Sequence, residues 1–224
     1  MEWLKQERQK LKTMTPAKQL EYIWQYYKLW LCGFAALAAV LVYTGTSIAS
    51  AVKDNYLYLV FVGTYADIGE GSAFYKDFLS FSGTDPQTQS VIFDTGNYFN
   101  MAEEDVTGNH YFEKVTVLID SRTADALVME PDNLTAFGAN GRLMDLSDPR
   151  ARLLTDQYAD RLITISFTDE QGQIQNIPVG FDISDSILMT KFNLYADGCA
   201  LGISSDAQHI DAVGQFLNYL LQGR

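Results

Sequence analysis

The longest apolar run of the chain lies near its N-terminus. Residues 29–52 read LWLCGFAALAAVLVYTGTSIASAV and contain no charged side chain. About 20 apolar residues are enough for an α-helix to cross the hydrocarbon layer of a membrane. Aromatic residues stand at both ends of the run, as they do where a helix meets a membrane–water interface. The pattern therefore predicts a transmembrane helix over residues 29–52.

The residues before this run are polar and basic. Thr15 and Pro16 are typical of a helix start, and residues 1–28 carry a net charge of +3. Because basic flanks stay in the cytoplasm, we expect a cytoplasmic amphipathic helix here and an extracytoplasmic C-terminal domain. The chain is then a single-pass protein of the cell membrane, in contact with the lipid bilayer. A cleaved signal peptide is the alternative, but its apolar core would be shorter and closer to the start.

After Lys53 the hydrophobic pattern alternates between strand-like and helix-like segments. Short apolar runs predict strands at 56–62, 90–93, 126–129, 162–167, 174–179, 186–189 and 199–203. Apolar positions three or four residues apart predict helices at 69–81, 110–119, 131–137, 148–158 and 206–221. Asp206 is the expected cap of the last helix. Because strands and helices alternate and a single hairpin comes late, we predict one mixed-sheet α/β domain over residues 53–224.

Charge and cysteine content narrow the range of partners. The formal net charge is −12, and since residues 1–28 carry +3, the remainder carries −15. That charge repels phosphate, so we expect no nucleic-acid partner. Cys32 and Cys199 stand far apart in the sequence, and with only two histidines they form no zinc-binding pattern. We expect no disulfide, no metal and no other cofactor.

Two segments of the outer domain carry a family resemblance. Residues 124–149 read ADALVMEPDNLTAFGANGRLMDLSDP, and residues 177–182 read IPVGFD. They resemble a strand, short helix and Ala-Asn-Gly stretch, and a cleft-facing strand, of type II periplasmic or extracellular solute-binding proteins. The aromatic N-terminal helix also resembles that of membrane-anchored proteins of Gram-positive gut bacteria. The 172 residues after Val52 have room for about one lobe of the two that this class uses, so the resemblance implies a single-lobe relative.

The ends of the predicted strands nominate a binding site, because open α/β sheets bind ligands beyond the carboxyl ends of their strands. The candidate ligand-binding residues are Thr64, Tyr65, Asp94, Thr95, Asn97, Tyr98, Glu130 and Asp182. Their hydroxyls, amide, aromatic rings and carboxylates suit a small polar or cationic solute. The alternative is that residues 94–97 form only a turn, which these residue types favour.

Catalytic motifs are scarce. Residues 91–96, VIFDTG, resemble the signature of aspartic proteases, but those enzymes need two carboxylates and no second Asp-Thr-Gly or Asp-Ser-Gly occurs. Nucleophile-elbow, P-loop and His-Glu-x-x-His motifs are missing from the sequence. The run Glu103-Glu104-Asp105 lacks the spacing of a calcium loop and predicts a solvated loop. We therefore expect no catalytic residues and no enzyme.

Two functional hypotheses follow. The first is a membrane-anchored, extracytoplasmic solute-binding-like or accessory module of a membrane complex, such as a transporter or an envelope assembly. The second is a structural or interaction subunit of a cell-envelope assembly that has no small-molecule ligand.

Overall fold

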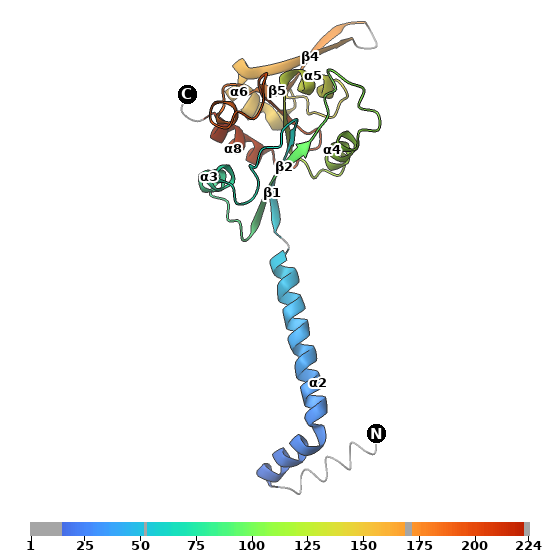
Figure 1. The fold of residues 1–224 in the computed structure, drawn as a ribbon, viewed down its shortest axis with the longest axis vertical. Coiled ribbons are helices and arrows are strands. Elements are labelled where there is room, and N and C mark those ends of the chain that lie inside the picture. Colours follow the sequence, from blue (N-terminus) through green and yellow to red (C-terminus); the bar gives the residue numbers. More distant parts are fainter. Residues whose placement is uncertain (1–14, 52, 169–171, 222–224) are drawn as a thin grey trace. The chain divides into compact units, whose positions relative to one another are not determined.

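The computed structural model describes residues 15–51, 53–168 and 172–221. Contacts within the chain divide it into two units, Met1–Val52 and Lys53–Arg224. Over residues 15–51 the first unit forms one helix, α2 (Pro16–Ala51), which begins where Thr15 and Pro16 predicted a helix start (Figure 1). Residues 1–14 of the predicted N-terminal helix lie outside the described residues. Within the described part of the chain, no helix has the combination of length and apolar content required to cross a membrane.

The second unit is a mixed α/β fold built on a six-stranded sheet with the order β2-β1-β3-β6-β5-β4. The strands are β1 (Asp54–Val62), β2 (Gln89–Asn97), β3 (Ala126–Met129), β4 (Leu162–Thr168), β5 (Ile174–Asp182) and β6 (Ala200–Ile203). β1 pairs in parallel with β2 and β3, and the other neighbours pair antiparallel. The predicted mixed sheet and its late hairpin, β4–β5, are confirmed.

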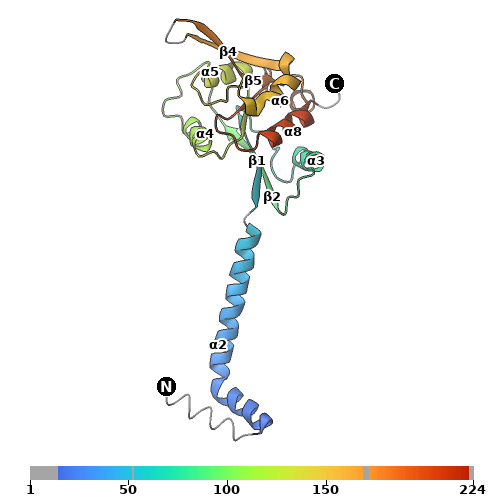
Figure 2. The ribbon, with the colours of Figure 1, turned by 180° about the vertical axis from the view of Figure 1, so that it is seen from behind.

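Helices cover both faces of this sheet (Figures 1 and 2). One face carries α3 (Ala73–Ser82), α6 (Arg152–Gln157) and α8 (Ile210–Leu220), and the other carries α4 (His110–Asp120) and α5 (Pro131–Gly138). Alternate residues of β1 pack against the helices on opposite faces of the sheet. Leu57, Leu59 and Phe61 pack with α3 and α8, whereas Val60 and Val62 pack with α4 and α5. Since the strand is buried on both faces, it reads as a continuous apolar run and not as an alternation.

One predicted strand is a helix instead. Residues 186–189 lie at α7 (Ile187–Thr190), a single turn in which the Thr190 N–H donates to the Ser186 carbonyl at 2.9 Å. A run of three apolar residues, Ile187 to Met189, does not separate a buried strand from a buried helical turn, so the pattern predicted the wrong element. Two predicted helices also begin later than expected. Residues 69–72 are a turn before α3, and Pro149–Ala151 forms a 3₁₀ turn before α6.

The predicted start and cap of the last helix are wrong. α8 begins at Ile210, and its N-cap residue His209 makes no side-chain cap hydrogen bond. The carboxylate of Asp125, directly before β3, accepts hydrogen bonds from the backbone N–H groups of Gln208 at 3.3 Å and His209 at 3.1 Å. Asp206 instead faces solvent, 4.0 Å from Arg122. The entry to α8 is therefore fixed by a carboxylate 84 positions earlier in the chain.

Candidate functional site

A cavity of about 380 Å³ opens at the carboxyl ends of β1, β2 and β3. Val62 ends β1, Tyr98 follows β2 and Glu130 follows β3, and all three line the cavity. The polar lining residues are Tyr98, Asn100, Glu103, Glu104, Glu130 and Asn133. The cavity thus occupies the edge of the sheet where open α/β folds bind their ligands.

The loop after β2 forms one wall of the cavity, and two asparagines hold it. Asn133 of α5 is buried; its Oδ1 accepts from the Met101 N–H at 2.9 Å and its Nδ2 donates to the Phe99 carbonyl at 2.9 Å. Asn109 caps α4 with its Oδ1, and its Nδ2 donates to the Tyr98 carbonyl at 3.0 Å. Because buried side-chain hydrogen bonds of this kind are costly to break, the loop is tied to both helices of this face.

Three carboxylates line the cavity: Glu103, Glu104 and Glu130. None of the described residues that line it is basic. The pKa of the half-buried Glu130 carboxyl is raised above its ordinary value, first by burial and then by the negative charges of Asp197, Glu103 and Asp132. A positive charge placed in the cavity offsets the repulsion from these negative charges and stabilises the ionised form of Glu130.

An aromatic pair stands beside these carboxylates. The rings of Tyr65 and Tyr98 stack with a centroid distance of 3.9 Å and an interplanar angle of 28°. Tyr65 is 72% exposed, whereas Tyr98 is half-buried and lines the cavity. Burial, followed by the Tyr65 hydroxyl, raises the pKa of Tyr98, which keeps its phenol protonated. Aromatic faces attract cations, so the pair adds to the preference that the carboxylates set.

Two predicted ligand-binding residues, Asp94 and Asn97, have protein partners. The Asp94 carboxylate accepts from Lys114 Nζ at 2.7 Å and from the Tyr58 hydroxyl at 3.1 Å. Asn97 is fully buried; its Nδ2 donates to the Phe61 carbonyl at 3.3 Å and its Oδ1 accepts from Lys114 at 3.0 Å. Both side chains therefore hold β2 against β1 and α4, outside the cavity lining.

The other predicted residues are distributed along the same edge of the sheet. Thr64 is buried, and its Oγ1 accepts from the Ala66 N–H at 3.3 Å. Thr95 belongs to β2, and the interpretation of 94–97 as a turn is wrong because these residues pair with β1 across a bulge. Asp182 ends β5, is exposed, and accepts from the Ser184 N–H at 2.9 Å. Of the eight predicted residues, the cavity lining contains Tyr98 and Glu130.

The sequence interpretation missed four polar residues of the cavity: Asn100, Glu103, Glu104 and Asn133. The acidic run was predicted as a solvated loop, and it is exposed, but it also turns toward the cavity. The sequence did contain one signal for this: the acidic run follows β2, a strand whose carboxyl end lies at the ligand-binding edge of the sheet. What the sequence does not reveal is that Asn133 fastens this loop over the ends of β1 and β3.

A second hollow, of about 660 Å³, lies beside the start of α8. Its main polar groups are already engaged within the protein. Arg150 pairs with Asp148 at 3.0 Å, and His209 Nδ1 lies 3.0 Å from the buried Asp125 carboxylate. The Tyr56 hydroxyl donates to Gln215 at 2.6 Å. Since these groups are satisfied, the cavity at the carboxyl edge is the stronger candidate site.

The described residues show neither a metal-binding cluster nor an activated thiol. Within them, no three His, Cys, Asp or Glu side chains gather closely enough to hold a metal ion. Cys32 is exposed and Cys199 is buried, and both are free thiols. Burial, followed by the charge of Asp182, raises the pKa of the Cys199 thiol, which disfavours the reactive thiolate.

Comparison with known proteins gives one structural likeness. No family model matches the chain, and no curated protein matches it. Among solved structures, the chain is similar to an extracellular solute-binding protein family 1 from Alicyclobacillus acidocaldarius subsp. acidocaldarius DSM 446, with 18% identity and a TM-score of 0.31. The match covers 58% of this chain and 28% of that protein, so the chain spans less than a third of its length. Values this low establish neither a shared family nor a shared ligand.

Proposed function

We propose that the unit Lys53–Arg224 binds a small solute with a cationic group in the cavity at the carboxyl edge of the sheet. The observation that carries this proposal is the lining of the cavity, where Glu103, Glu104 and Glu130 meet Tyr98 without a basic residue among the described lining. The volume of about 380 Å³ is in the range of small-molecule sites. Carboxylates and an aromatic face are the groups that bind amines and quaternary ammonium ions.

Charge also argues against other ligand classes. An anionic solute placed in the cavity meets three carboxylates, within a region of the chain that carries −15 outside residues 1–28. A neutral polyol finds acceptors but leaves the charge of Glu130 uncompensated in a half-buried position. A monocation or dication of amino-acid size offsets the repulsion among these carboxylates, so its binding is coupled to their ionisation.

We also propose that the chain presents this module outside the cell membrane, where it acts as an accessory subunit of a membrane complex. The support is in the sequence: residues 29–52 have no charge, and the basic residues precede them. A small unit with a cavity at the edge of its sheet suits delivery of a solute to a neighbouring subunit, since the unit has about the length of one lobe.

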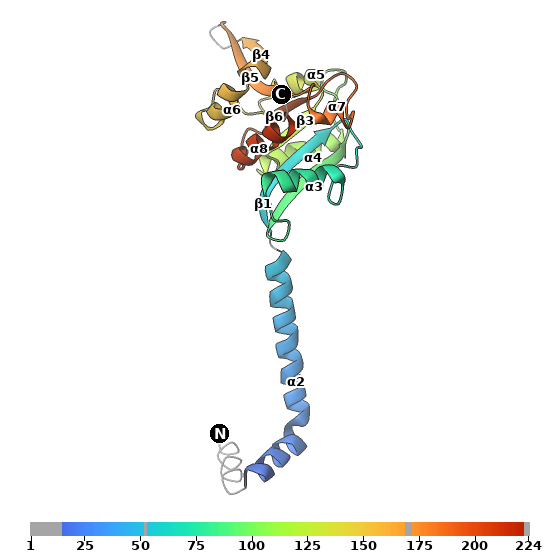
Figure 3. The same cartoon turned by 90° about the vertical axis from the view of Figure 1, so that its left-hand side faces the viewer.

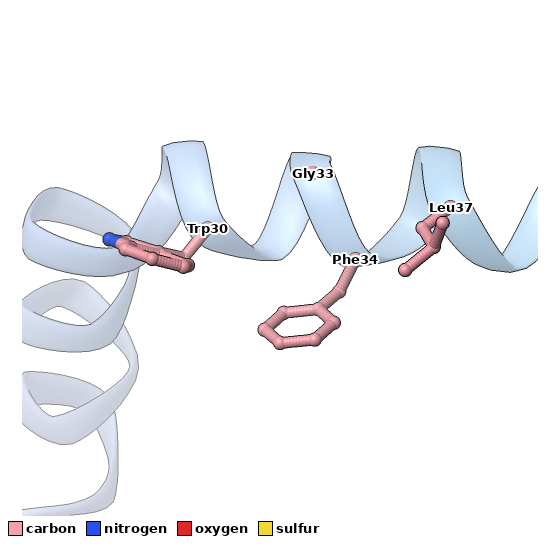
Figure 4. Close-up of a pocket in the computed structure, with 4 residues that line it drawn as sticks. All are labelled: Trp30, Gly33, Phe34 and Leu37. Carbon is pink, nitrogen blue, oxygen red and sulfur yellow. The ribbon is translucent and has the colours of Figure 1, made fainter.

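A structural role in an envelope assembly is the second candidate, and one observation favours it. Trp30, Gly33, Phe34 and Leu37 lie on one face of α2 around an apolar hollow of about 320 Å³ (Figure 4). The side chains of Trp30, Phe34 and Leu37 are more than half exposed in the described chain. Such a face packs well against an apolar helix of another subunit, with Gly33 allowing close approach.

Calorimetric titration of the full-length chain in mild detergent tests the solute hypothesis. The probes are putrescine, choline, L-lysine and L-arginine, with glucose and L-glutamate as the neutral and anionic comparisons. We expect at least one cationic probe to bind, and Glu130→Gln to weaken it roughly tenfold. Asp156→Asn is the matched control. The Asp156 side chain is 71% exposed on α6, so this substitution removes one negative charge outside the cavity. Binding that is equal in wild type and Glu130→Gln, or absent for every cation, contradicts the proposal.

Membrane anchoring is tested separately. Cells that express the chain are fractionated, and the membranes are washed with alkaline carbonate, which removes peripheral proteins. We expect the chain to stay with the membranes, and added protease to digest residues 53–224 in intact spheroplasts. Release by carbonate, or protection of that unit from the protease, overturns the proposed location. Replacement of Trp30, Phe34 and Leu37 by Ala then separates the two candidate functions. Under the assembly role, partner proteins no longer co-purify with this variant. Under the solute-binding role, co-purification does not depend on that face.

A further inference from the structure

The sheet ends in two edge strands, β2 and β4, which differ in how they are protected. Within the described residues, no strand pairs with the outer side of β4. The β4–β5 hairpin extends beyond the helices that cover the sheet (Figures 1 and 3). An edge strand offers unpaired N–H and C=O groups to any strand that can lie beside it.

β2 carries the usual protections of an edge and β4 does not. β2 has a bulge between the positions opposite Val60 and Val62, and it contains the charged side chain of Asp94. β4 reads LITISFT, seven residues without charge, proline or glycine. The irregularity in its pairing lies in β5, where Val179 is the extra residue between Gly180 and Pro178. β4 is therefore open to pairing along its whole length.

The two faces of β4 have different and regular chemistry. Ile163 and Ile165 pack partly against the cluster under α5, and Phe167, 44% exposed, is the next residue on the same face. The opposite face presents Thr164 and Ser166, both exposed. From Ile163 to Phe167, apolar and hydroxyl residues thus alternate in a pattern that is symmetric about Ile165, whereas Leu162 has Thr168 as its counterpart at the other end.

We propose that two copies of this chain dimerise by antiparallel pairing of their β4 strands, with the two-fold axis at Ile165. In this register all seven residues of β4 are paired. Ile163 of one copy lies opposite Phe167 of the other, Ile165 lies opposite itself, and Thr164 lies opposite Ser166. At the two ends, Leu162 lies opposite Thr168. The two apolar faces coincide on one side of a continuous sheet, and the hydroxyl residues meet on the other.

The composition of β4 favours a second copy over a different protein. A two-fold interface places the same patch on both subunits, so it requires a self-complementary patch. β4 meets that requirement from Ile163 to Phe167, where apolar and hydroxyl residues each face their own kind about Ile165. It has no charged side chain that would select an oppositely charged strand, and it brings no like charges together although the unit as a whole is acidic.

Disulfide trapping tests the register. In a Cys32→Ser background of the full-length chain, Ile165→Cys places two thiols directly opposite each other across the axis. Directly opposed residues of an antiparallel pair have Cα atoms about 4.5–5.5 Å apart, which lies within the range that a disulfide spans. Leu153→Cys is the control, because Leu153 is 81% exposed on α6. We expect a covalent dimer from Ile165→Cys alone; equal cross-linking of both variants, or none, overturns the proposal.

Sedimentation equilibrium in detergent tests the interface without a cross-link. Phe167→Lys places a charge opposite Ile163 twice in each dimer, and we expect it to raise the dimer dissociation constant about tenfold. Val117→Lys on α4 is the matched control, since Val117 is also exposed and gains the same charge. A monomeric wild type overturns the proposal, as does equal weakening by both variants.

Discussion

The carboxylate of Asp125 is predicted to be a main support of the unit Lys53–Arg224. Its side chain is fully buried. It accepts hydrogen bonds from the backbone N–H groups of Tyr58 at 2.9 Å, Gln208 at 3.3 Å and His209 at 3.1 Å. It also contacts His209 Nδ1 at 3.0 Å. One side chain therefore connects β1 and the start of α8 to the start of β3.

Asp125→Ala removes the acceptor for three backbone donors at once. An unsatisfied buried donor costs about 1–3 kcal/mol, whereas donors at the edge of the fold regain part of this from water. Because His209 is 34% exposed at its side chain, we expect water to compensate partly at the α8 end. The expected loss is about 3 kcal/mol, which corresponds to a decrease in Tm of about 10 °C for a unit of this size.

Differential scanning calorimetry of the full-length chain is the suitable assay. The three tryptophans, Trp3, Trp24 and Trp30, all precede Lys53, so tryptophan fluorescence does not report on this unit. Asp206→Ala is the control. The Asp206 side chain is 55% exposed, and its removal should cost less than about 0.5 kcal/mol, against about 1 kcal/mol for a helix cap. Equal losses for the two variants would refute the assignment of the capping role to Asp125.

Two further predictions concern packing and charge. Gly180→Ala should destabilise the unit by about 1–3 kcal/mol in urea unfolding, because a Cβ there lies 2.4 Å from the Leu134 side chain and 2.8 Å from the Leu201 carbonyl; Gly69→Ala, with open space, should be near neutral. Glu130→Gln should raise the Tm at pH 7. The pKa of Glu130 is raised in the folded state, so its ionised form opposes folding; the gain should disappear below about pH 4, where the carboxyl is protonated in both states. A lower Tm for Glu130→Gln at pH 7 would contradict the proposed role of its charge.

Local patterns predicted most of the elements of the sheet and its helices, because apolar spacing follows from which faces are buried. They failed where the deciding contact is remote in sequence. The last helix begins at Ile210 because Asp125, far earlier in the chain, binds the residues before it. α7 was predicted as a strand because three apolar residues carry too little periodicity.

The candidate site was found in outline for a topological reason. The carboxyl ends of β1, β2 and β3 meet at one edge, so residues after those strands were expected to be close together. Which of them face the cavity depends on side-chain partners that spacing does not show. Lys114 engages Asp94 and Asn97, whereas Asn133 brings the loop with Glu103 to the cavity. Glu130 was therefore predicted from the sequence, whereas the other two carboxylates of the cavity, Glu103 and Glu104, emerged only from the structure.

The order of the strands also determines when the unit can fold. β6, the last strand in the sequence, lies inside the sheet between β3 and β5. Val128 of β3 pairs with Leu201 of β6, so the two halves of the sheet join only through a segment near the C-terminus. A growing chain cannot complete its sheet until that segment is available, and contacts so distant in sequence form slowly. The unit consequently stays incompletely folded until residues 200–203 have been synthesised and can enter the sheet between β3 and β5.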